Sequence, residues 1–322
     1  MPKTVDISDQ TDYTDQITNM LLSITVGSKR FLTNKVDRCV TGRVAMQQTV
    51  GEIQLPLNNL GVMALDFKSN RGIATSIGFS PIVSLIDEKK GAKIALLKSL
   101  TNIIWAPIEK GITNISLSAN WMWPANNVGE NARLYNAVKA ISDFAIKLGI
   151  NIPTGKDSLS MTQKYSDGKK VLSPGTVIVS AASEVSDINK TISPVLKKDQ
   201  DSELIYINFC KGLNISGSAF YQTLTSIGNT VHNTKKPKKI IKQMSIPEKV
   251  IPESKIVLPK GIKINITPTT FTLSKGENTL SRIYPSAMLN ITDDGKNILL
   301  KGKSHNVRVR TIIGTFNAHI TN

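Results

Sequence analysis

Hydrophobic residues along the first 230 positions follow two different periods. Short segments rich in β-branched or aromatic residues, each bounded by turn formers, predict strands at residues 61–67, 114–122, 175–183 and 203–209. Residues 129–148 carry apolar side chains at alternating spacings of four and three, namely Leu134, Val138, Ile141, Ala145 and Leu148. That spacing predicts one face of an amphipathic helix. The two periods together predict a mixed α/β domain.

A second helix is predicted from Asp87 to Trp105, with Asp87 as N-cap and Pro107 just beyond its end. Within it, the stretch ALLKSLTNII is apolar except for a few polar positions. Lys98 and Asn102 lie one turn apart on one face of this helix. The sequence alone leaves open whether this pair is a working site, the remains of one, or ordinary surface.

The composition and the hydrophobic pattern of the chain change after residue 230. Residues 231–243, VHNTKKPKKIIKQ, hold five lysines and little that could pack, and we interpret them as a basic linker. Short strands are then predicted at residues 261–266, 270–274, 279–284, 288–292 and 297–301. The last apolar residues fall at helical spacing, namely Val309, Ile312, Ile313, Phe316 and Ile320. This part is predicted to be a small antiparallel sheet carrying one helix.

The positive charge is concentrated in the same part of the chain. Of the net charge of +16, the residues from Val231 onward contribute 16 Lys and Arg against 5 Asp and Glu. Dense lysine and arginine are typical of a surface that neutralises phosphates, and a merely soluble surface is the alternative. We predict a cytoplasmic protein without a membrane segment, because the apolar runs are far shorter than the ~20 residues that span a bilayer.

Short motifs indicate no chemistry by themselves. The two cysteines, Cys39 and Cys210, show no zinc or disulfide pattern and are predicted to be small buried hydrophobes. There is no glycine-rich phosphate loop of a common type and no HExxH motif. All three histidines lie beyond residue 231, so the α/β part contains no histidine to act as a general base.

Longer blocks carry more information. The stretch from Val26 to Leu57 (VGSKRFLTNKVDRCVTGRVAMQQTVGEIQLPL), LSANWMWPANNVGENARLYNAVKAI, IPTGKDSLSM and SPGTVIVSA occur in order. They resemble phosphoribosylformylglycinamidine synthase, a glutamine-dependent enzyme of purine biosynthesis, over roughly residues 12–230. The resemblance implies an aminoimidazole-ribonucleotide-synthetase-like (PurM-like) mixed α/β domain over residues 1–190. It implies an incomplete second subdomain over residues 191–230.

That family forms its product by ATP-dependent phosphorylation of a formamide oxygen, followed by displacement with ammonia. Its complete enzyme has two synthetase units and a glutaminase domain. Only the second N-type unit and the start of its partner are represented here, so the other half and the glutaminase would have to come from another chain. The resemblance therefore implies ATP or ADP and magnesium as ligands, in a chain that we expect to lack catalysis alone.

The residue types at the implied metal positions differ from those of the family. An Asp, a Glu and an Asn hold magnesium on nucleotide phosphates in the family, and their positions correspond to Asn59, Lys98 and Asn102. An ammonium repels a cation, so only Asn102 is a residual metal ligand. We favour Lys98 as a solvated helix residue; the alternative is that it contacts a nucleotide phosphate in place of the metal.

A second implied contact lies in the GKDSLSM block. Lys156, Asp157 and Ser158 keep the form they have in the family, and the resemblance implies that they touch phosphate or magnesium. The alternative is that this loop persists only as a structural turn.

The tail has a relative of its own. The stretch IPESKIVLPKGIKINITPTTFTLSKGENTLSRIY, followed by VRVRTIIGTFNAHI, resembles the first domain of the large-subunit ribosomal protein six/nine family over residues 244–322. Its KGEN turn departs from the family pattern, and the family's second domain is not represented. The resemblance implies ribosomal RNA as a partner. Candidate RNA contacts are Lys235, Lys236, Lys238, Lys239, Lys301, Lys303, Arg308 and Arg310.

Three functional hypotheses follow from these two resemblances. The chain is a segment of the purine synthase or a nucleotide-binding remnant of it, joined through the basic linker to a ribosomal-protein-like domain. The alternative is a structural constituent of the large ribosomal subunit. A third reading is an inert product of gene decay, and the joining of two families is either a real fusion or an artefact of the gene model.

Overall fold

The computed structural model describes the α/β part of the chain and the strands of the tail. The described residues are 12–33, 42–52, 54, 58–195, 207–210 and 215–244, followed by the separate strands β9 to β16 between residues 255 and 320. Side chains are described up to residue 244, with Phe31 excepted.

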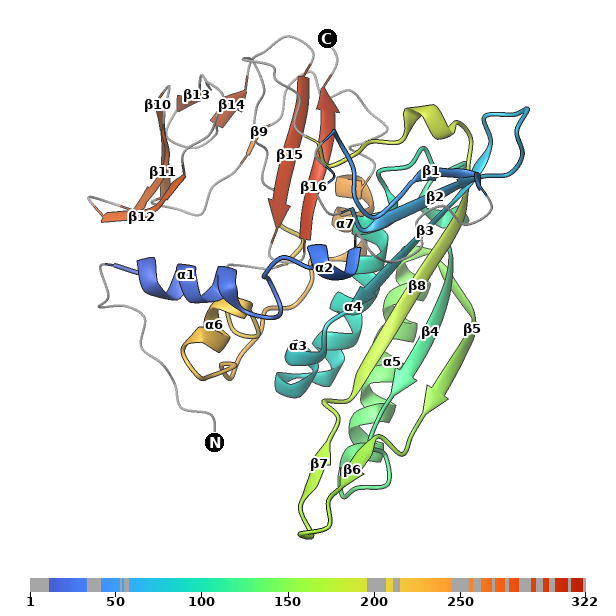
Figure 1. The fold of residues 1–322 in the computed structure, drawn as a ribbon, viewed down its shortest axis with the longest axis vertical. Helices are drawn as coiled ribbons and strands as arrows, with labels where there is room; N and C mark the ends of the chain where they lie inside the picture. The colour runs from blue at the N-terminus through green and yellow to red at the C-terminus, as the bar shows by residue number, and fades with distance from the viewer. Residues whose placement is uncertain are drawn as a thin grey trace.

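A six-stranded mixed sheet forms the centre of the α/β part (Figure 1). Its strand order is β1-β2-β3-β8-β4-β5. All neighbouring pairs are antiparallel except β4 and β5, which are parallel. The bounds are β1 Val44–Met46, β2 Leu60–Ala64, β3 Gly72–Phe79, β8 Thr176–Val185, β4 Ser116–Met122 and β5 Asn151–Ser158. The prediction of a mixed α/β domain is confirmed.

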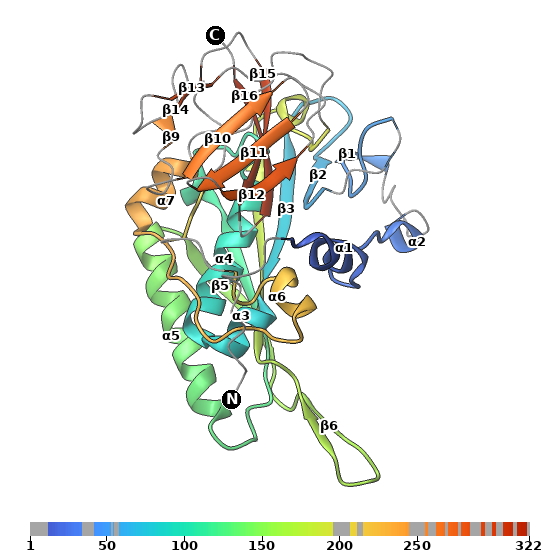
Figure 2. The ribbon, with the colours of Figure 1, turned by 90° about the vertical axis from the view of Figure 1, so that its left-hand side faces the viewer.

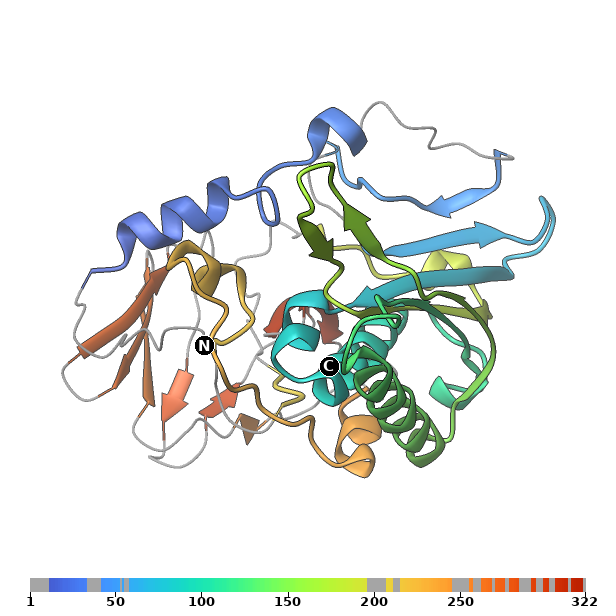
Figure 3. The same cartoon turned by 90° about the horizontal axis from the view of Figure 1, so that it is seen from below.

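Helices cover one face of this sheet (Figure 3). They are α3 Pro81–Ile86, α4 Glu88–Ile103 and α5 Glu130–Leu148, and α4 packs directly on β3 and β8. Residues of β3 alternate strictly between buried and exposed, as expected for a strand with one covered face. On the other face, Ile73, Ile77 and Phe79 are 41–54% exposed. The core therefore lies between the helix layer and one side of the sheet.

Small side chains let α4 approach β3 closely. A Cβ atom at Gly78 would overlap the backbone carbonyl of Ala95 and the backbone amide of Ser99. Beside it, Ser76 Oγ donates a buried hydrogen bond of 2.7 Å to the Ser99 carbonyl. Only glycine fits at a strand position whose Cβ would occupy the space of helix backbone. This contact fixes which turn of α4 lies at the end of β3.

The two long helices agree with the predictions. Asp87 is the N-cap of α4, and its carboxylate accepts a hydrogen bond from the Lys90 amide at 2.9 Å. Helix α5 ends at Gly149, which adopts the left-handed φ of 72° that terminates many helices. The buried face of α5 is Ala137, Ile141, Phe144, Ala145 and Leu148. Val138, which was assigned to that face, is 41% exposed.

Several shorter elements surround this domain (Figures 1 and 2). A hairpin, β6 and β7, projects beyond the end of the sheet near β5 and the start of α5. The bounds of these elements are α1 Thr14–Leu22, α2 Arg30–Thr33, α6 Ala219–Thr223, β6 Thr162–Lys164, β7 Lys170–Leu172, and the 3₁₀ turns η2 Ile112–Asn114 and η3 Ile188–Lys190.

The segment interpreted as a basic linker is partly helical. Helix α7, Pro237–Met244, packs against α5 and buries the side chains of Ile240 and Met244. The expectation that residues 231–243 have little to pack is therefore wrong, because Ile240 and Met244 lie one turn apart on the buried side of a short helix. The proposed domain boundaries on either side of it stay a prediction.

The tail consists of β structure in its described residues. The strands are β9 Lys255–Ile256, β10 Ile262–Thr267, β11 Thr270–Lys275, β12 Asn278–Ile283, β13 Ile291–Asp293, β14 Ile298–Leu300, β15 His305–Thr311 and β16 Gly314–Ile320. They form small antiparallel sheets with the orders β10-β11-β12, β13-β14-β9 and β15-β16. The predicted closing helix is wrong, since residues 305–311 and 314–320 pair as a hairpin.

Three strands of the central sheet, β1, β3 and β5, were not foreseen, and one predicted strand is not found in its described residues. β3 has the sequence GIATSIGF, which contains two glycines and reads poorly as a strand. β5 includes the GKDS block, which was interpreted as a loop. Of the predicted strand 203–209, residues 203–206 lie outside the described residues and residues 207–209 are not in a strand. Strands 61–67, 114–122 and 175–183 are confirmed as β2, β4 and β8.

Candidate functional site at the end of strand β3

Lys98 and Asn102 both bind the backbone of β3. Lys98 Nζ donates to the Phe79 carbonyl at 3.1 Å, and Asn102 Nδ2 donates to the Ile77 carbonyl at 2.9 Å. Strand β2 begins at Leu60, opposite Ser76, so residues 77–79 of β3 extend beyond their β2 neighbour. Backbone carbonyls without a strand partner need another donor. The two helix side chains supply it.

The environment of Lys98 is unusual for an ammonium group. Its Nζ lies 5.3 Å from the centre of the Phe79 ring, within the range of a cation–π contact. Burial lowers the pKa of Lys98 from its ordinary value. The interpretation of Lys98 as a solvated helix residue is therefore wrong: the side chain is half-buried and fixed on the end of β3. It still has donor capacity to spare, because an ammonium has three donors.

Asn59 lies near the same end of β3. It directly precedes Leu60, whose partner in the sheet is Ser76, one residue before Ile77. Its side chain is exposed, and its neighbour Asn58 donates to the Gln47 carbonyl at 3.1 Å. The fold thus brings together the three positions that the sequence resemblance grouped as metal ligands.

The second group of predicted residues lies elsewhere on the sheet. Lys156, Asp157 and Ser158 form the end of β5, an edge strand, and Lys156 Nζ donates to Ser158 Oγ. The block is therefore strand and not loop. β5 is separated from β3 by β8 and β4, and three strand spacings of about 4.8 Å amount to ~14 Å.

The two groups are connected by one row of the sheet. Phe79 pairs with Ile178, Ile178 with Asn120, and Asn120 with Lys156. Directly opposite residues in a sheet share a face, and this row lies on the face without helices. Asn120 Oδ1 is buried and has no hydrogen-bond partner among the described residues. An unsatisfied buried acceptor is costly, so the middle of this row favours a ligand that carries a donor.

The donor set at the end of β3 does not fit magnesium. Magnesium takes hard oxygen ligands, usually with one or two carboxylates. The structure offers an exposed amide at Asn59, an ammonium at Lys98 and the remaining amide oxygen of Asn102. The carboxylate of Asp157 belongs to β5, which β8 and β4 separate from β3. Within the described residues no three His, Cys, Asp or Glu side chains gather as metal ligands.

The candidate RNA contacts are spread over two parts of the chain. Lys235 and Lys236 line a hollow beside α4 and α5, whereas Lys238 and Lys239 are exposed on α7. Arg308 and Arg310 belong to β15. Lys301 and Lys303 lie outside the described residues.

Cys210 behaves as the sequence suggested, while Cys39 lies outside the described residues. Cys210 is a free, buried thiol, and burial raises its pKa to about 11. Its backbone forms an isolated β-bridge with Thr234. Trp123 is a packing residue and is 1% exposed.

Sequence reasoning missed several residues that shape the site. Gly78 sets the approach of α4, and its only signal was the small-large alternation of GIATSIGF. It also missed four lysines of α4 and α5 that face the hollow, namely Lys89, Lys93, Lys139 and Lys147. Their spacing of four or eight residues on predicted helices was the available signal.

Residues 28–184 match the family model described as "FGAR-AT PurM_N-like domain". The six-stranded mixed sheet with helices on one face is the PurM-like α/β domain of this match. The matched range includes all six predicted cofactor positions, from Asn59 to Ser158.

Curated relatives agree with this match. The probable phosphoribosylformylglycinamidine synthase, chloroplastic/mitochondrial, of Arabidopsis thaliana is 42% identical over 227 residues, which cover 70% of this chain and 16% of that protein. The synthase of Dictyostelium discoideum is 41% identical over 244 residues, covering 73% and 18%. The chain thus spans less than a fifth of the length of these relatives.

Among solved structures, "T. maritima PurL complexed with AMPPCP" is 18% identical, with a TM-score of 0.39 over 60% of this chain and 28% of that one. The family model ends at residue 184, so the tail lies outside the residues it matches. Among the residues with described structure, no helix has the length and apolar character needed to cross a bilayer.

Proposed function

We propose that this chain is a nucleotide-binding unit of phosphoribosylformylglycinamidine synthase that has lost its magnesium ligands and is not catalytically competent alone. The observation that carries the proposal is Lys98. Its ammonium occupies the position of a carboxylate in the family and is held on the Phe79 carbonyl at 3.1 Å. A cation fixed there attracts phosphate and repels magnesium.

Two further features support a nucleotide on the helix-free face of the sheet. Lys156 ends the row on β5, and Lys98 of α4 contacts Phe79 at its other end through the Phe79 carbonyl and ring, so positive charge lies at both ends. Between them, the buried Asn120 Oδ1 lacks a donor. When bound, ATP would supply a transferable phosphoryl group. The residues of this chain would contribute binding and orientation, because they include no general base of the histidine type before residue 231.

A partner synthetase unit is part of the same proposal. Met63, Ile73 and Ile77 are 38–54% exposed on the strands β2 and β3. Contiguous exposed apolar side chains commonly mark an interaction surface. We propose that the missing synthetase half, provided by another chain, packs on this face, and that the ammonia source is also a separate chain.

Thermal unfolding of the full chain with ADP, in the presence and absence of magnesium, tests the proposal. A ligand at 100 times its Kd stabilises the folded state by about 2.7 kcal/mol, which corresponds to a rise in Tm of about 5 °C or more. We expect ADP to raise Tm equally with and without magnesium. If ADP at millimolar concentration does not raise Tm, the proposed nucleotide binding is wrong and the chain is an inert remnant of the synthase.

Replacing Lys98 provides the sharper version of this test. Lys98→Glu restores a carboxylate, so the ADP-dependent shift should become dependent on magnesium. Lys98→Gln removes the charge without adding a ligand and serves as the control, with a weaker shift that magnesium does not change. A magnesium-dependent shift in the unchanged chain would contradict the loss of the metal site.

A ribosomal role for the tail is the second candidate, and one observation favours it. Arg308 and Arg310 both belong to β15, which pairs with β16 in a hairpin. If the tail binds ribosomal RNA, affinity should fall steeply with salt and weaken when Lys235, Lys236, Lys238 and Lys239 are changed to glutamine. Unchanged affinity in that variant would exclude these lysines as RNA contacts.

A further inference from the structure

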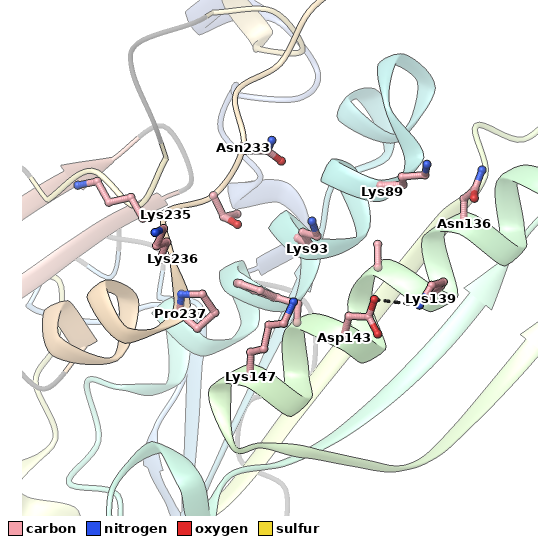
Figure 4. A pocket seen from close by; sticks show the side chains of 13 residues that line it. Lys89, Lys93, Asn136, Lys139, Asp143, Lys147, Asn233, Lys235, Lys236 and Pro237 are labelled. Carbon is pink, nitrogen blue, oxygen red and sulfur yellow. Dashed lines mark hydrogen bonds and ion pairs between the residues drawn. The ribbon is translucent and has the colours of Figure 1, made fainter.

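A hollow of about 530 Å³ lies on the helix side of the domain, away from the site at β3 (Figure 4). Its walls come from α4, α5 and residues 233–237. Lys93 of α4 faces this hollow, and five residues at 100° each place it ~140° around the helix from Lys98. The hollow is therefore a separate feature that does not depend on the proposed nucleotide site.

The charge lining this hollow is strongly one-sided. Six lysines line it, namely Lys89, Lys93, Lys139, Lys147, Lys235 and Lys236, against the single carboxylate of Asp143. Asp143 forms an ion pair with Lys139 at 3.2 Å. For the other five lysines, the described part of the chain shows no ion pair. Like charges gathered around one hollow repel one another, and a bound anion would offset that repulsion.

The third wall of the hollow is held in place by specific contacts. The Lys235 amide donates to the Phe209 carbonyl at 2.8 Å, and Thr234 bridges to Cys210. Lys90 Nζ donates to the Val231 carbonyl at 2.8 Å, and Ile240 anchors the following helix in the core. These contacts hold the backbone of the segment that carries Lys235 and Lys236. Burial and the nearby positive charge of Lys239 lower the pKa of Lys235, as expected for an ammonium in an electropositive and partly desolvated environment.

A row of lysines on a helix is ordinarily just a solvated surface, and Lys147 also suits the C-terminal turn of α5 on helix-dipole grounds. That explanation does not account for lysines of three separate segments that converge on one hollow. In Figure 4 the labelled side chains of Lys93, Lys147 and Lys236 approach the same space from α4, α5 and the segment before α7.

We propose that this hollow, the lysine cleft, binds a small molecule that carries at least two phosphate groups. Its volume lies in the range of small-molecule sites, about 300–1,000 Å³. Lysine ammonium groups act as point charges that suit phosphate oxygens. A single-stranded nucleic acid is disfavoured, because bases need exposed aromatic rings for stacking and the one aromatic lining residue, Phe144, is 5% exposed.

Calorimetric titration of the full chain with inorganic pyrophosphate tests this assignment, with orthophosphate and a short single-stranded RNA as comparison ligands. The key variant is Lys93→Gln with Lys236→Gln. Its matched control is Lys164→Gln with Lys170→Gln, which removes the same charge from two exposed, paired positions of the β6–β7 hairpin. We expect pyrophosphate to bind about 10-fold more weakly to the cleft variant and unchanged to the control.

Two further variants make the outcome decisive. Asp143→Asn removes the only lining carboxylate and should strengthen pyrophosphate binding about 3-fold. The Lys93→Gln and Lys236→Gln changes are also made in a Lys98→Gln background, where they should weaken pyrophosphate binding by the same factor, so a failure at the β3 site and a failure here are distinguishable. The proposal is overturned by equal affinities of the cleft variant and its control, by absence of saturable pyrophosphate binding, or by RNA binding that responds to the cleft variant while pyrophosphate binding does not.

Discussion

Helix α4 carries lysines to two regions that differ in what surrounds them. At the end of β3, Lys98 has a carbonyl partner and an aromatic ring, and its position is fixed by the close packing at Gly78. In the lysine cleft, Lys93 faces other lysines, and no ion pair is found for it in the described part of the chain. The first region has a structural role that stands without any ligand. The second has no such role in its own fold.

This difference shows that residue type alone does not assign a lysine to a site. Lys98 drew attention because the resemblance placed it on a metal position, yet the protein uses it to satisfy a strand end. No motif pointed to Lys93, yet its surroundings are more electropositive than those of Lys98. The partner of each ammonium, which depends on the neighbouring segments, decides its function.

The largest expected effect comes from Gly78→Ala, which disrupts the packing of α4 on the β3 region. The added Cβ would overlap helix backbone at Ala95 and Ser99, so α4 must shift. We expect a loss of about 3 kcal/mol or more in the free energy of unfolding, measured with urea. Gly61→Ala on β2 is the control: its nearest contact would be Thr75 Oγ1 at 3.2 Å, and about 1 kcal/mol is expected. Equal losses would show that Gly78 is not specially constrained.

The burial of Cys210, next to the segment that lines the lysine cleft, can be tested by the pH dependence of stability. The folded-state pKa of Cys210 is raised to about 11, so the folded protein keeps its thiol proton between pH 9 and 11 while the unfolded chain releases it. The associated stability is fully present below pH 9 and is lost as the pH rises through 11. The loss is about 2 to 3 kcal/mol at most.

The measurement is chemical unfolding at several pH values for the unchanged chain and for Cys210→Ala. Because the alanine leaves a small cavity, the comparison uses the difference in pH dependence between the two proteins. Parallel curves from pH 8 to 11 would mean that Cys210 is not buried beside Thr234.

A smaller effect is expected from removing the α4 side chain that donates a hydrogen bond to the backbone near the end of β3. Asn102→Ala leaves the Ile77 carbonyl without its donor, and we expect a loss of about 1 kcal/mol in unfolding free energy. Asn131→Ala on the exposed first turn of α5 is the control and should change little. If both variants lose the same amount, the hydrogen bond to β3 carries no special weight.

The smallest effect is expected in the lysine cleft itself. Asp143→Asn breaks an exposed ion pair with Lys139, whose partners are four residues apart on α5. Such pairs contribute about 0.3 to 0.5 kcal/mol, so the unfolding free energy should fall only slightly. A loss above 1 kcal/mol would indicate that the carboxylate balances several lysines rather than one.

Much of the α/β part could be predicted because its signals are local. The caps and apolar spacing of α4 and α5 act within a few residues, and three strands had β-branched sequences bounded by turns. β3 could not be predicted in the same way. Its residues Ser76 and Gly78 suit close contact with α4, and its sheet partner β8 lies about 100 residues further along the chain, so no local signal marks it as a strand. The hairpin of the tail was misread as a helix because apolar residues at spacings of three and four also fit two short strands joined by a turn.

The sequence by itself determined the mixed α/β class of the domain that matches the family model, the caps of its long helices and most of their buried faces, and the residue types at Asn59, Lys98 and Asn102. Only the tertiary structure decided what these residues contact. A strand end with open carbonyls, and a hollow shared by three segments, arise when distant parts of the chain pack together. Hydrogen bonds and charge repulsion act through space over a few ångströms, so their partners cannot be read from positions along the chain.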